Sequence, residues 1–279
     1  MDRTSVSREL ARFRLAPPTR LPHGQVGELR TRGLGSSSEF HELREYRLGD
    51  DIRRIDWRSS MRTDRWMLRL YREEIEPRLD VIVDASLSMG AFAVKASRLR
   101  ELVALLKGLA TRDGFRARAR RFADGGPDDA EGDFDLDGRL DLAEGLRRAP
   151  VSGAGRPWRI VLSDFLFETD PRQLVTSLAS GGSRLSLLQI LTARELRPDL
   201  HGFYRLVDAE SGTEKMTAIG PQEIRRYRER LQRWNAELAD VARAHGAQYL
   251  LLEADRPLGE LARDVLLPAG ILVPAGACR

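Results

Sequence analysis

The chain has 279 residues, of which 42% are hydrophobic and 32% charged, which is typical of a folded globular protein and excludes an intrinsically disordered one. No run of about 18 apolar residues occurs, so we expect no transmembrane span, and the polar residues after Met1 show no signal peptide. The single cysteine, Cys278, excludes an internal disulfide framework, and we expect a cytoplasmic protein.

Basic residues exceed acidic ones, 46 against 42, and all but three of the basic residues are arginines. The excess is local, because residues 1–72 alone carry a net charge of about +6. This stretch leaves nucleic-acid binding open as one interpretation. The small net charge of the whole chain, +4, favours the other interpretation, in which most arginines pair with acidic side chains.

The first half of the chain predicts an arm followed by alternating strands and helices. Residues 1–38 are rich in glycine, proline and serine and predict a loop or arm. Residues 66–72 alternate in polarity as a strand does, and residues 79–84 form a β-branched run typical of a buried central strand. A helix is expected over 91–110 and a second strand over 114–122.

The second half continues the alternation. An acidic loop is followed by a helix at 140–148, a strand at 158–164, a helix at 171–179, a strand at 185–191, a hairpin at 204–218, a long helix from 221 to 245 and a strand at 248–252. The long helix carries one apolar stripe, which favours packing on a sheet over a coiled coil. This order predicts an α/β fold with a mostly parallel sheet flanked by helices.

A candidate site lies where the strand at 79–84 ends. Asp84, Ser86 and Ser88 form a D-x-S-x-S pattern on the turn into the next helix, and ligands of open α/β sheets bind at such carboxyl ends. Asp164 ends the strand at 158–164, so adjacent strands would bring it to the same cleft. Carboxylate and hydroxyl oxygens suit Mg²⁺. The alternative is that Ser86 or Ser88 only caps the helix.

Residues 33–57 contain an idiosyncratic string, G-L-G-S-S-S-E-F followed by L-R-E-Y-R-L-G-D-D-I-R-R-I-D-W. With V-D-A-S-L-S-M at 83–89, it resembles the bacterial "domain of unknown function 58" family. The resemblance implies a von Willebrand factor A-like (Rossmann-like) domain at 77–255, after an N-terminal β/loop extension at 1–76 and before a C-terminal segment at 256–279. It also implies a MoxR-type AAA+ ATPase as partner. A metal-ion-dependent adhesion site (MIDAS) would map onto Asp84, Ser86, Ser88 and Asp164.

Two features depart from that family. Its A-domains usually supply a threonine from a G-x-T-D-L-type loop, but the matching stretch here is Gly138-Arg139-Leu140-Asp141-Leu142. Leu140 has no side-chain oxygen to offer a metal, which predicts an incomplete ligand set. Many members also begin with membrane helices, and no such segment is expected in this sequence.

The acidic loop contains a second metal pattern. Asp133, Asp135, Asp137 and Glu144 fit D-x-D-x-D-G-x₅-E, the calcium loop of EF-hands, with Gly138 at the sharp turn. Residues 125–127 read Gly-Gly-Pro where an EF-hand has its entering helix, so Ca²⁺ binding competes with a second interpretation. In that interpretation the stretch is a solvated acidic loop leading into a helix.

The charged string at 39–57 has two interpretations. Its arginines and aromatic residues are typical of interface hot spots, which would make a partner-docking surface of Arg44, Tyr46, Arg47, Arg53, Arg54 and Trp57. The same arginines would otherwise pair internally with the neighbouring acidic residues.

These features predict a non-enzymatic, Mg²⁺-dependent protein-interaction module, the partner or adaptor of a MoxR-type AAA+ ATPase, which binds a carboxylate offered by its protein partner. One alternative is a Mg²⁺-dependent hydrolase of phosphoesters or peptides. Another is nucleic-acid binding through the Arg-rich first 72 residues. The sequence contains no G-x-S-x-G, H-E-x-x-H or Walker motif, and its four histidines have no metal-ligand spacing.

Overall fold

The chain folds into two compact units. The computed structural model describes residues 3–16, 39–47, 50–72, 77–130, 132–151, 157–181 and 184–276. The larger unit comprises residues 1–18 and 77–279, and the smaller comprises residues 19–76. The described residues 3–16 and 256–276 thus belong to the same compact unit as the sheet, whereas the sequence pattern placed both outside the domain at 77–255.

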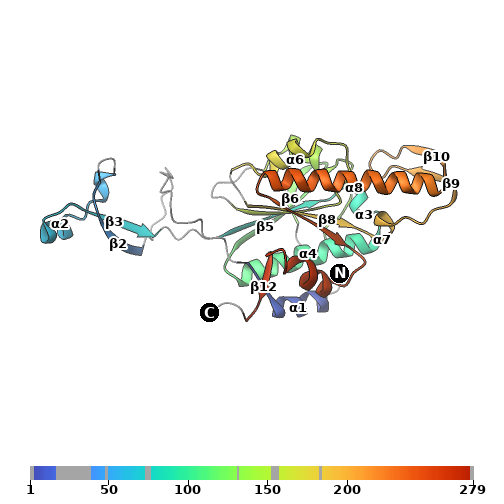
Figure 1. The fold of residues 1–279 in the computed structure, drawn as a ribbon. Helices are drawn as coiled ribbons and strands as arrows, with labels where there is room; N and C mark the ends of the chain where they lie inside the picture. The colour runs from blue at the N-terminus through green and yellow to red at the C-terminus, as the bar shows by residue number, and fades with distance from the viewer. Residues whose placement is uncertain are drawn as a thin grey trace. The chain divides into compact units, whose positions relative to one another are not determined.

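The larger unit is built on a six-stranded sheet with the order β11-β8-β7-β4-β5-β6 (Figure 1). All neighbouring strands are parallel except β5 and β6. The strands are β4 (Arg78–Asp84), β5 (Arg116–Ala123), β6 (Gly126–Asp129), β7 (Trp158–Ser163), β8 (Arg184–Leu191) and β11 (Gln248–Glu253). The predicted α/β class with a mostly parallel sheet is confirmed; β6, within the expected acidic loop, was not predicted.

Helices cover both faces of this sheet, as Figure 1 shows. One face packs against α4 (Ala93–Arg112), and the other packs against α5 (Leu142–Arg148), α6 (Pro171–Leu178) and α8 (Pro221–Ala244). Side chains alternate along β4, so that Val81 and Val83 face the α4 layer while Ile82 faces the other. This double coverage explains why the central strands are continuously apolar.

The long helix α8 packs on the sheet, as its apolar stripe predicted. Leu238 and Val241 belong to the same buried cluster as Val161 and Leu187 of the sheet. Towards the N-terminal end of the helix the stripe is less covered, and Tyr227 keeps 38% of its surface exposed. That end borders the candidate site.

The prediction of a loop or arm was wrong for the first 15 residues. Helix α1 (Arg3–Arg12) leads into β1 (Phe13–Leu15), which pairs antiparallel with β12 (Leu272–Pro274). Phe13 and Leu15 are buried against α4. Val6 of α1 is buried in the same cluster, so this packing stabilises the helix. The remaining arm residues, 17–38, lie outside the described residues.

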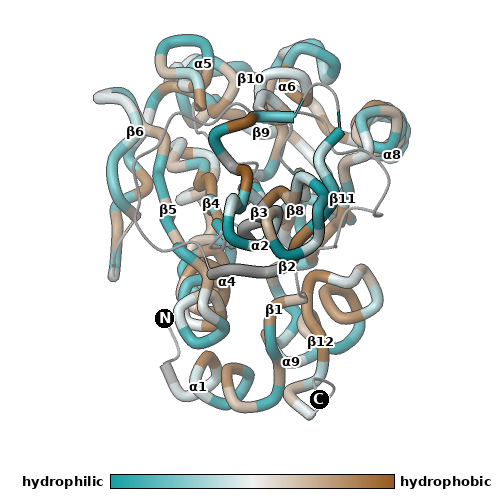
Figure 2. The backbone as a smooth tube through the Cα atoms, turned by 90° about the vertical axis from the view of Figure 1, so that its left-hand side faces the viewer, coloured by the Kyte–Doolittle hydropathy of each residue, from teal (hydrophilic) through white to brown (hydrophobic). Residues whose placement is uncertain are grey.

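The C-terminal segment completes the α4 face. Helix α9 (Leu258–Leu261) continues as a π-helical turn, Ala262–Leu266, before β12. Leu258, Leu261, Leu266 and Leu272 are all buried. Figure 2 shows the hydrophobic character of this segment from α9 to β12.

Three further elements shape the carboxyl edge of the sheet. The short helices α3 (Leu87–Gly90) and α7 (Ala193–Leu196) follow β4 and β8. Between α7 and α8, β9 (Gly202–Val207) and β10 (Glu214–Ile219) pair with each other as the predicted antiparallel hairpin.

The smaller unit is a two-stranded antiparallel sheet of β2 (Glu39–Glu45) and β3 (Met67–Arg72). A 3₁₀ turn, Ile52–Arg54, and helix α2 (Trp57–Thr63) connect the strands. Ile55 and Leu68 are its buried apolar residues, and the Asp56 side chain caps α2. Several acidic residues of the family string thus hold local backbone turns.

Candidate functional site

The two predicted carboxylates lie at the carboxyl ends of neighbouring strands. Strands β4 and β7 are adjacent and parallel, with Val83 opposite Leu162, one residue before Asp84 and two before Asp164. Both carboxylates are buried, with Asp84 fully enclosed and Asp164 1% exposed. The sequence-based expectation that adjacent strands bring them to one edge is therefore correct.

Asp84 accepts hydrogen bonds from neutral groups. One carboxylate oxygen accepts the Ser86 N–H at 3.0 Å, and the other accepts the Ser163 hydroxyl at 2.5 Å. Burial, followed by the charge of Asp164, raises the pKa of Asp84 to about 7, although its hydrogen bonds with Ser163 and Ser86 act to lower it. The ionised form of Asp84 is therefore a charge that a cation would stabilise.

The two serine hydroxyls of the turn lie side by side. The distance between Ser86 Oγ and Ser88 Oγ is 3.0 Å. Adjacent ligands of an octahedral Mg²⁺ with metal–oxygen bonds of about 2.1 Å are separated by about 3.0 Å, so this spacing fits one edge of such a site. Ser86 stands at the N-cap of α3 but makes no side-chain capping bond, so capping does not account for its hydroxyl.

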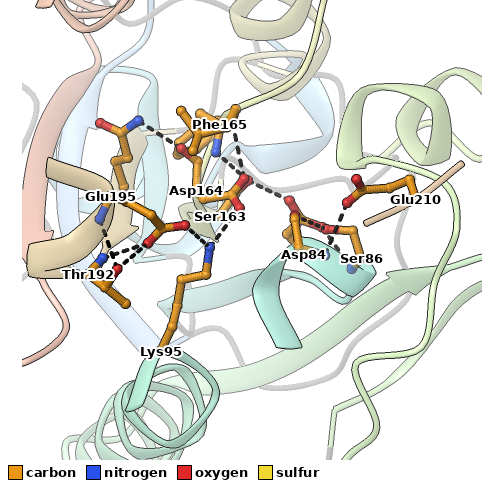
Figure 3. Close-up of polar contacts among 12 residues, drawn as sticks. Asp84, Ser86, Lys95, Ser163, Asp164, Phe165, Thr192, Glu195 and Glu210 are labelled. Carbon is orange, nitrogen blue, oxygen red and sulfur yellow. Dashed lines mark hydrogen bonds and ion pairs between the residues drawn. The ribbon is translucent and has the colours of Figure 1, made fainter. Parts of the chain in front are cut away.

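Asp164 already has a cationic partner. Figure 3 shows Lys95 between two carboxylates, with its Nζ 2.9 Å from Asp164 Oδ2 and 2.7 Å from Glu195 Oε1. The second Asp164 oxygen accepts the Leu166 N–H at 3.1 Å. Burial lowers the pKa of Lys95, but the two carboxylates outweigh it, so the pKa is raised and Lys95 stays charged. Asp164 thus lies beside Asp84 and shares the positive charge of Lys95 with Glu195.

Lys95 and Glu195 were missed by the sequence analysis, although both left signals. Lys95 is one of three lysines and falls on the buried face of the helix at 93–112. Thr192 and Glu195 form a T-x-x-E capping box, in which Glu195 Oε2 accepts the Thr192 N–H at 2.7 Å. This box fixes Glu195 so that its other oxygen meets Lys95.

A third carboxylate reaches the turn from a distant hairpin. Glu210 Oε1 accepts the Ser88 N–H at 3.1 Å, across 122 residues of sequence. Figure 3 shows the Glu210 side chain directed towards the turn that carries Asp84 and Ser86. The sequence predicted only a turn at Glu210-Ser211-Gly212, and nothing in that pattern indicated where the turn would point.

The loop before α5 packs along the same turn. Gly138 donates its N–H to the Ala85 carbonyl at 2.9 Å, and its own carbonyl accepts the Leu87 N–H at 2.7 Å. A Cβ at position 138 would lie 3.0 Å from the Ala85 oxygen, so this close approach requires glycine. Leu140 follows with no side-chain oxygen, and the Asp141 carboxylate caps α5.

The second predicted metal pattern is not assembled. Its acidic residues pair with different arginines: Asp133 with Arg100 at 2.7 Å, Asp137 with Arg121 at 3.4 Å, and Glu144 with Arg147 at 2.5 Å and Arg148 at 3.0 Å. In the described part of the chain, no group of three or more His, Cys, Asp or Glu side chains is placed to hold a metal. The structure therefore does not bring Asp133, Asp135, Asp137 and Glu144 together.

A cleft of about 930 Å³ opens beside the site. Its lining includes Ser88, Asp141, Asp164 and Glu210 on one side and Tyr227, Arg230 and Trp234 of α8 on the other. The Trp234 indole donates to the Phe165 carbonyl at 2.7 Å, which fixes the strand end that carries Asp164. The described histidine side chains, those of His201 and His245, do not line it.

The proposed docking residues of the smaller unit divide into two groups. Arg44 is engaged internally, 2.8 Å from Asp50, and this contact lowers the pKa of Asp50. Tyr46 packs against the Trp66 ring at 5.6 Å between centroids. Arg47, Arg53 and Trp57 are exposed, with Trp57 at 62%, and the Arg54 side chain lies outside the described residues. Docking through the exposed group stays a prediction.

Comparisons with known proteins agree with the sequence resemblance. The family model described as "Protein of unknown function DUF58" matches residues 42–128. No curated protein matches the chain. Similar solved structures are the conserved hypothetical protein BatB from Bacteroides thetaiotaomicron and an aerotolerance-related membrane protein from Bacteroides fragilis carrying multiple mutations to serines. Each is 14% identical with a TM-score of 0.36, and the matches cover 63% of this chain and 90% and 92% of those chains.

Within the described residues, no helix has both the length and the apolar character that crossing a bilayer requires. The family match begins in the Arg-rich string and extends past the turn that carries Asp84, Ser86 and Ser88. Residues 42–128 therefore match the model of the family that the sequence resemblance named.

Proposed function

We propose that the protein is a non-enzymatic, metal-dependent protein-interaction module and the partner or adaptor of a MoxR-type AAA+ ATPase. Mg²⁺ held at the turn of residues 84–88 would bind a carboxylate of the partner, so that the cation and an acidic side chain together form the contact. The geometry of the turn supports the metal-dependent contact. The resemblance to the DUF58 family supports the choice of ATPase.

The observation that carries the metal site is the environment of Asp84. Its carboxylate is fully buried, lies beside Asp164 and has a pKa raised to about 7. Burying an ionised carboxylate without a cation is costly, so such a group either keeps its proton or binds a positive charge. The two hydroxyl oxygens 3.0 Å apart on the next residues supply further ligands of the type that Mg²⁺ prefers.

The other residues have distinct roles in this proposal. Ser86 and Ser88 would hold Mg²⁺ with Asp84, while Asp164 would act directly or through water. Lys95 pairs with both Asp164 and Glu195, so its one positive charge offsets only part of the negative charge beside Asp84. Mg²⁺ held by Asp84, Ser86 and Ser88 would have one carboxylate among these ligands, so further coordination positions stay open to a carboxylate from a partner.

Direct titration tests the metal site. We expect Mg²⁺ to bind with measurable heat and to raise the melting temperature, and we expect Asp84→Asn to abolish both effects. Asp199→Asn, at an exposed aspartate away from the cleft, is the matched control and should behave as the wild type. Equal Mg²⁺ responses in Asp84→Asn and the wild type would contradict the site.

Affinity capture from the native cell tests the partner. The bait is the full chain, with parallel captures in Mg²⁺ and in EDTA and with the Asp84→Asn variant. Recovery of a MoxR-type ATPase only from the wild-type bait in Mg²⁺ supports the proposal. Equal recovery in EDTA would contradict metal-dependent contact, and recovery of no ATPase would contradict the choice of partner.

A further inference from the structure

The contact between Glu210 and Ser88 joins two segments that do not otherwise belong together. Ser88 lies on the turn after the central strand β4, and Glu210 lies in the loop between β9 and β10. A carboxylate from elsewhere in the chain thus reaches the place where the proposed function puts a carboxylate from a partner.

The loop that carries Glu210 is a preformed turn. Asp208 accepts the Ser211 N–H at 2.7 Å and the Ser211 hydroxyl at 2.6 Å, and Gly212 has a φ of 69°. The Asp208 N–H donates to the Thr213 carbonyl at 2.9 Å, which closes the loop. These bonds order the turn from within, so it presents Glu210 without support from the sheet.

The hairpin itself is weakly covered. Strands β9 and β10 pair with each other only, within the described residues. Phe203 is 86% exposed, Met216 is 71% exposed and Val207 is 55% exposed, so these apolar side chains do not anchor the hairpin to the larger unit. A two-stranded hairpin with little buried apolar surface has low local stability and moves at little cost.

We propose that Glu210 is the site's own carboxylate ligand, which the β9–β10 hairpin holds in the position that the partner's carboxylate takes. The partner then binds by displacing the tip of the hairpin. This inference rests on the proposed function, because it concerns the same cation. It deepens that function: the module is closed by its own chain until an acidic partner competes for the cation.

Mn²⁺ serves as the probe, because its affinity and the number of exchangeable waters on the bound ion are both measurable by water-proton relaxation. We expect Glu210→Gln to weaken Mn²⁺ binding by about tenfold and to add exchangeable water to the bound ion. Millimolar acetate should then remove that water in Glu210→Gln and have a smaller effect in the wild type. The matched control is Glu214→Gln in the same hairpin, whose exposed partner is Arg205.

The outcomes separate this inference from the proposed function. Binding in the wild type that Asp84→Asn abolishes, with no change of affinity or hydration in Glu210→Gln, overturns the role of Glu210 and leaves the metal site standing. Equal Mn²⁺ binding by the wild type and Asp84→Asn, or none by either, overturns both. An equal change in Glu214→Gln and Glu210→Gln also overturns the inference, because it would show a general effect of the hairpin's charge.

Discussion

Asp84 and Asp164 lie at the ends of neighbouring strands, yet the two carboxylates have different electrostatic environments. Asp164 has Lys95 at 2.9 Å and a backbone N–H on its other oxygen, while Asp84 accepts bonds from a hydroxyl and a backbone N–H. Asp164 therefore has a positive charge of the chain beside it, while the hydrogen bonds that Asp84 accepts come from neutral groups. The proposed function accordingly places the cation at Asp84, Ser86 and Ser88.

The largest effect is expected from removing the ammonium group of Lys95, which distinguishes the environment of Asp164 from that of Asp84. Lys95→Met leaves Asp164 and Glu195 buried without their positive charge, and we expect a loss of about 3–5 kcal/mol in the free energy of unfolding. Urea denaturation measures it, and Lys215→Met on the exposed hairpin is the control. A loss below about 1 kcal/mol would mean that the ion pairs do not hold this edge.

The pH dependence of stability tests the environment of Asp84. Its pKa is raised from 3.8 to about 7 in the folded protein, so without metal the folded state loses stability as the pH rises from about 4 to about 7. Asp84→Asn has no such charge. In EDTA we expect the free energy of unfolding of Asp84→Asn to rise relative to that of the wild type by on the order of 3 kcal/mol between pH 4 and pH 8.

The same titration has a counterpart with metal. In the proposed function Mg²⁺ binds the ionised carboxylate, so its stabilisation of the wild type should grow as the pH rises through 7. Unfolding curves at four pH values, with Mg²⁺ and with EDTA, measure both effects. A difference between wild type and Asp84→Asn that is constant with pH would refute the raised pKa.

The carboxylate of Asp113 lies away from the site, and its side chain is 4% exposed. It tests whether hydrogen bonds offset the cost of burying a carboxylate. Burial raises its pKa, but hydrogen bonds from Arg112, the Leu15 N–H and Arg14 outweigh this, so the pKa is lowered. The stability it contributes is therefore present at neutral pH and is lost as the pH falls through its folded pKa, below 3.8. We expect Asp113→Asn to cost about 1–2 kcal/mol at pH 7 and to speed hydrogen exchange in β1.

Protection at β1 in Asp113→Asn equal to that in the wild type would show that packing alone holds the strand. Leu15→Ala is the informative companion, because it removes buried apolar surface and keeps the hydrogen bonds of Asp113.

The smallest effect is expected in the exposed acidic loop. Asp137 pairs with Arg121 at the surface, so Asp137→Asn should change stability by less than about 0.5 kcal/mol. Because its carboxylates are held apart, millimolar Ca²⁺ added to Asp84→Asn should leave tryptophan fluorescence unchanged. A saturable fluorescence response to Ca²⁺ in Asp84→Asn that disappears when Asp137→Asn is added would instead support calcium binding by this loop.

Sequence patterns predicted β4, β7 and β8 because these central strands are buried on both faces and read as nearly continuous apolar runs. They also predicted that Asp84 and Asp164 would meet, since topology brings parallel strand ends together. They failed for α1 and β1, whose partner β12 lies at the far end of the sequence. The same reason hid Glu210, because its position depends on a hairpin that no local pattern orients.

The calcium pattern shows a different difficulty. Its glycine was interpreted as a residue of a metal loop, but Gly138 serves a close approach to Ala85. Glycine suits both the sharp turn of a calcium loop and a close backbone approach, and the contact with Ala85 shows that the second applies at Gly138. For Lys95 the signal was present in the sequence, because a lysine is rare in this chain and this one falls on the apolar face of a helix. The pattern alone did not indicate its carboxylate partners.

The pairing of β1 with β12 sets the order in which the larger unit is completed. Phe13 emerges early in synthesis, but its partner Pro274 emerges only after the whole sheet, with the smaller unit made in between. The first strand therefore has no partner strand for most of translation, and the β1–β12 pair forms only when the last strand has been made. A stalled or shortened chain that lacks β12 would leave β1 without its partner strand.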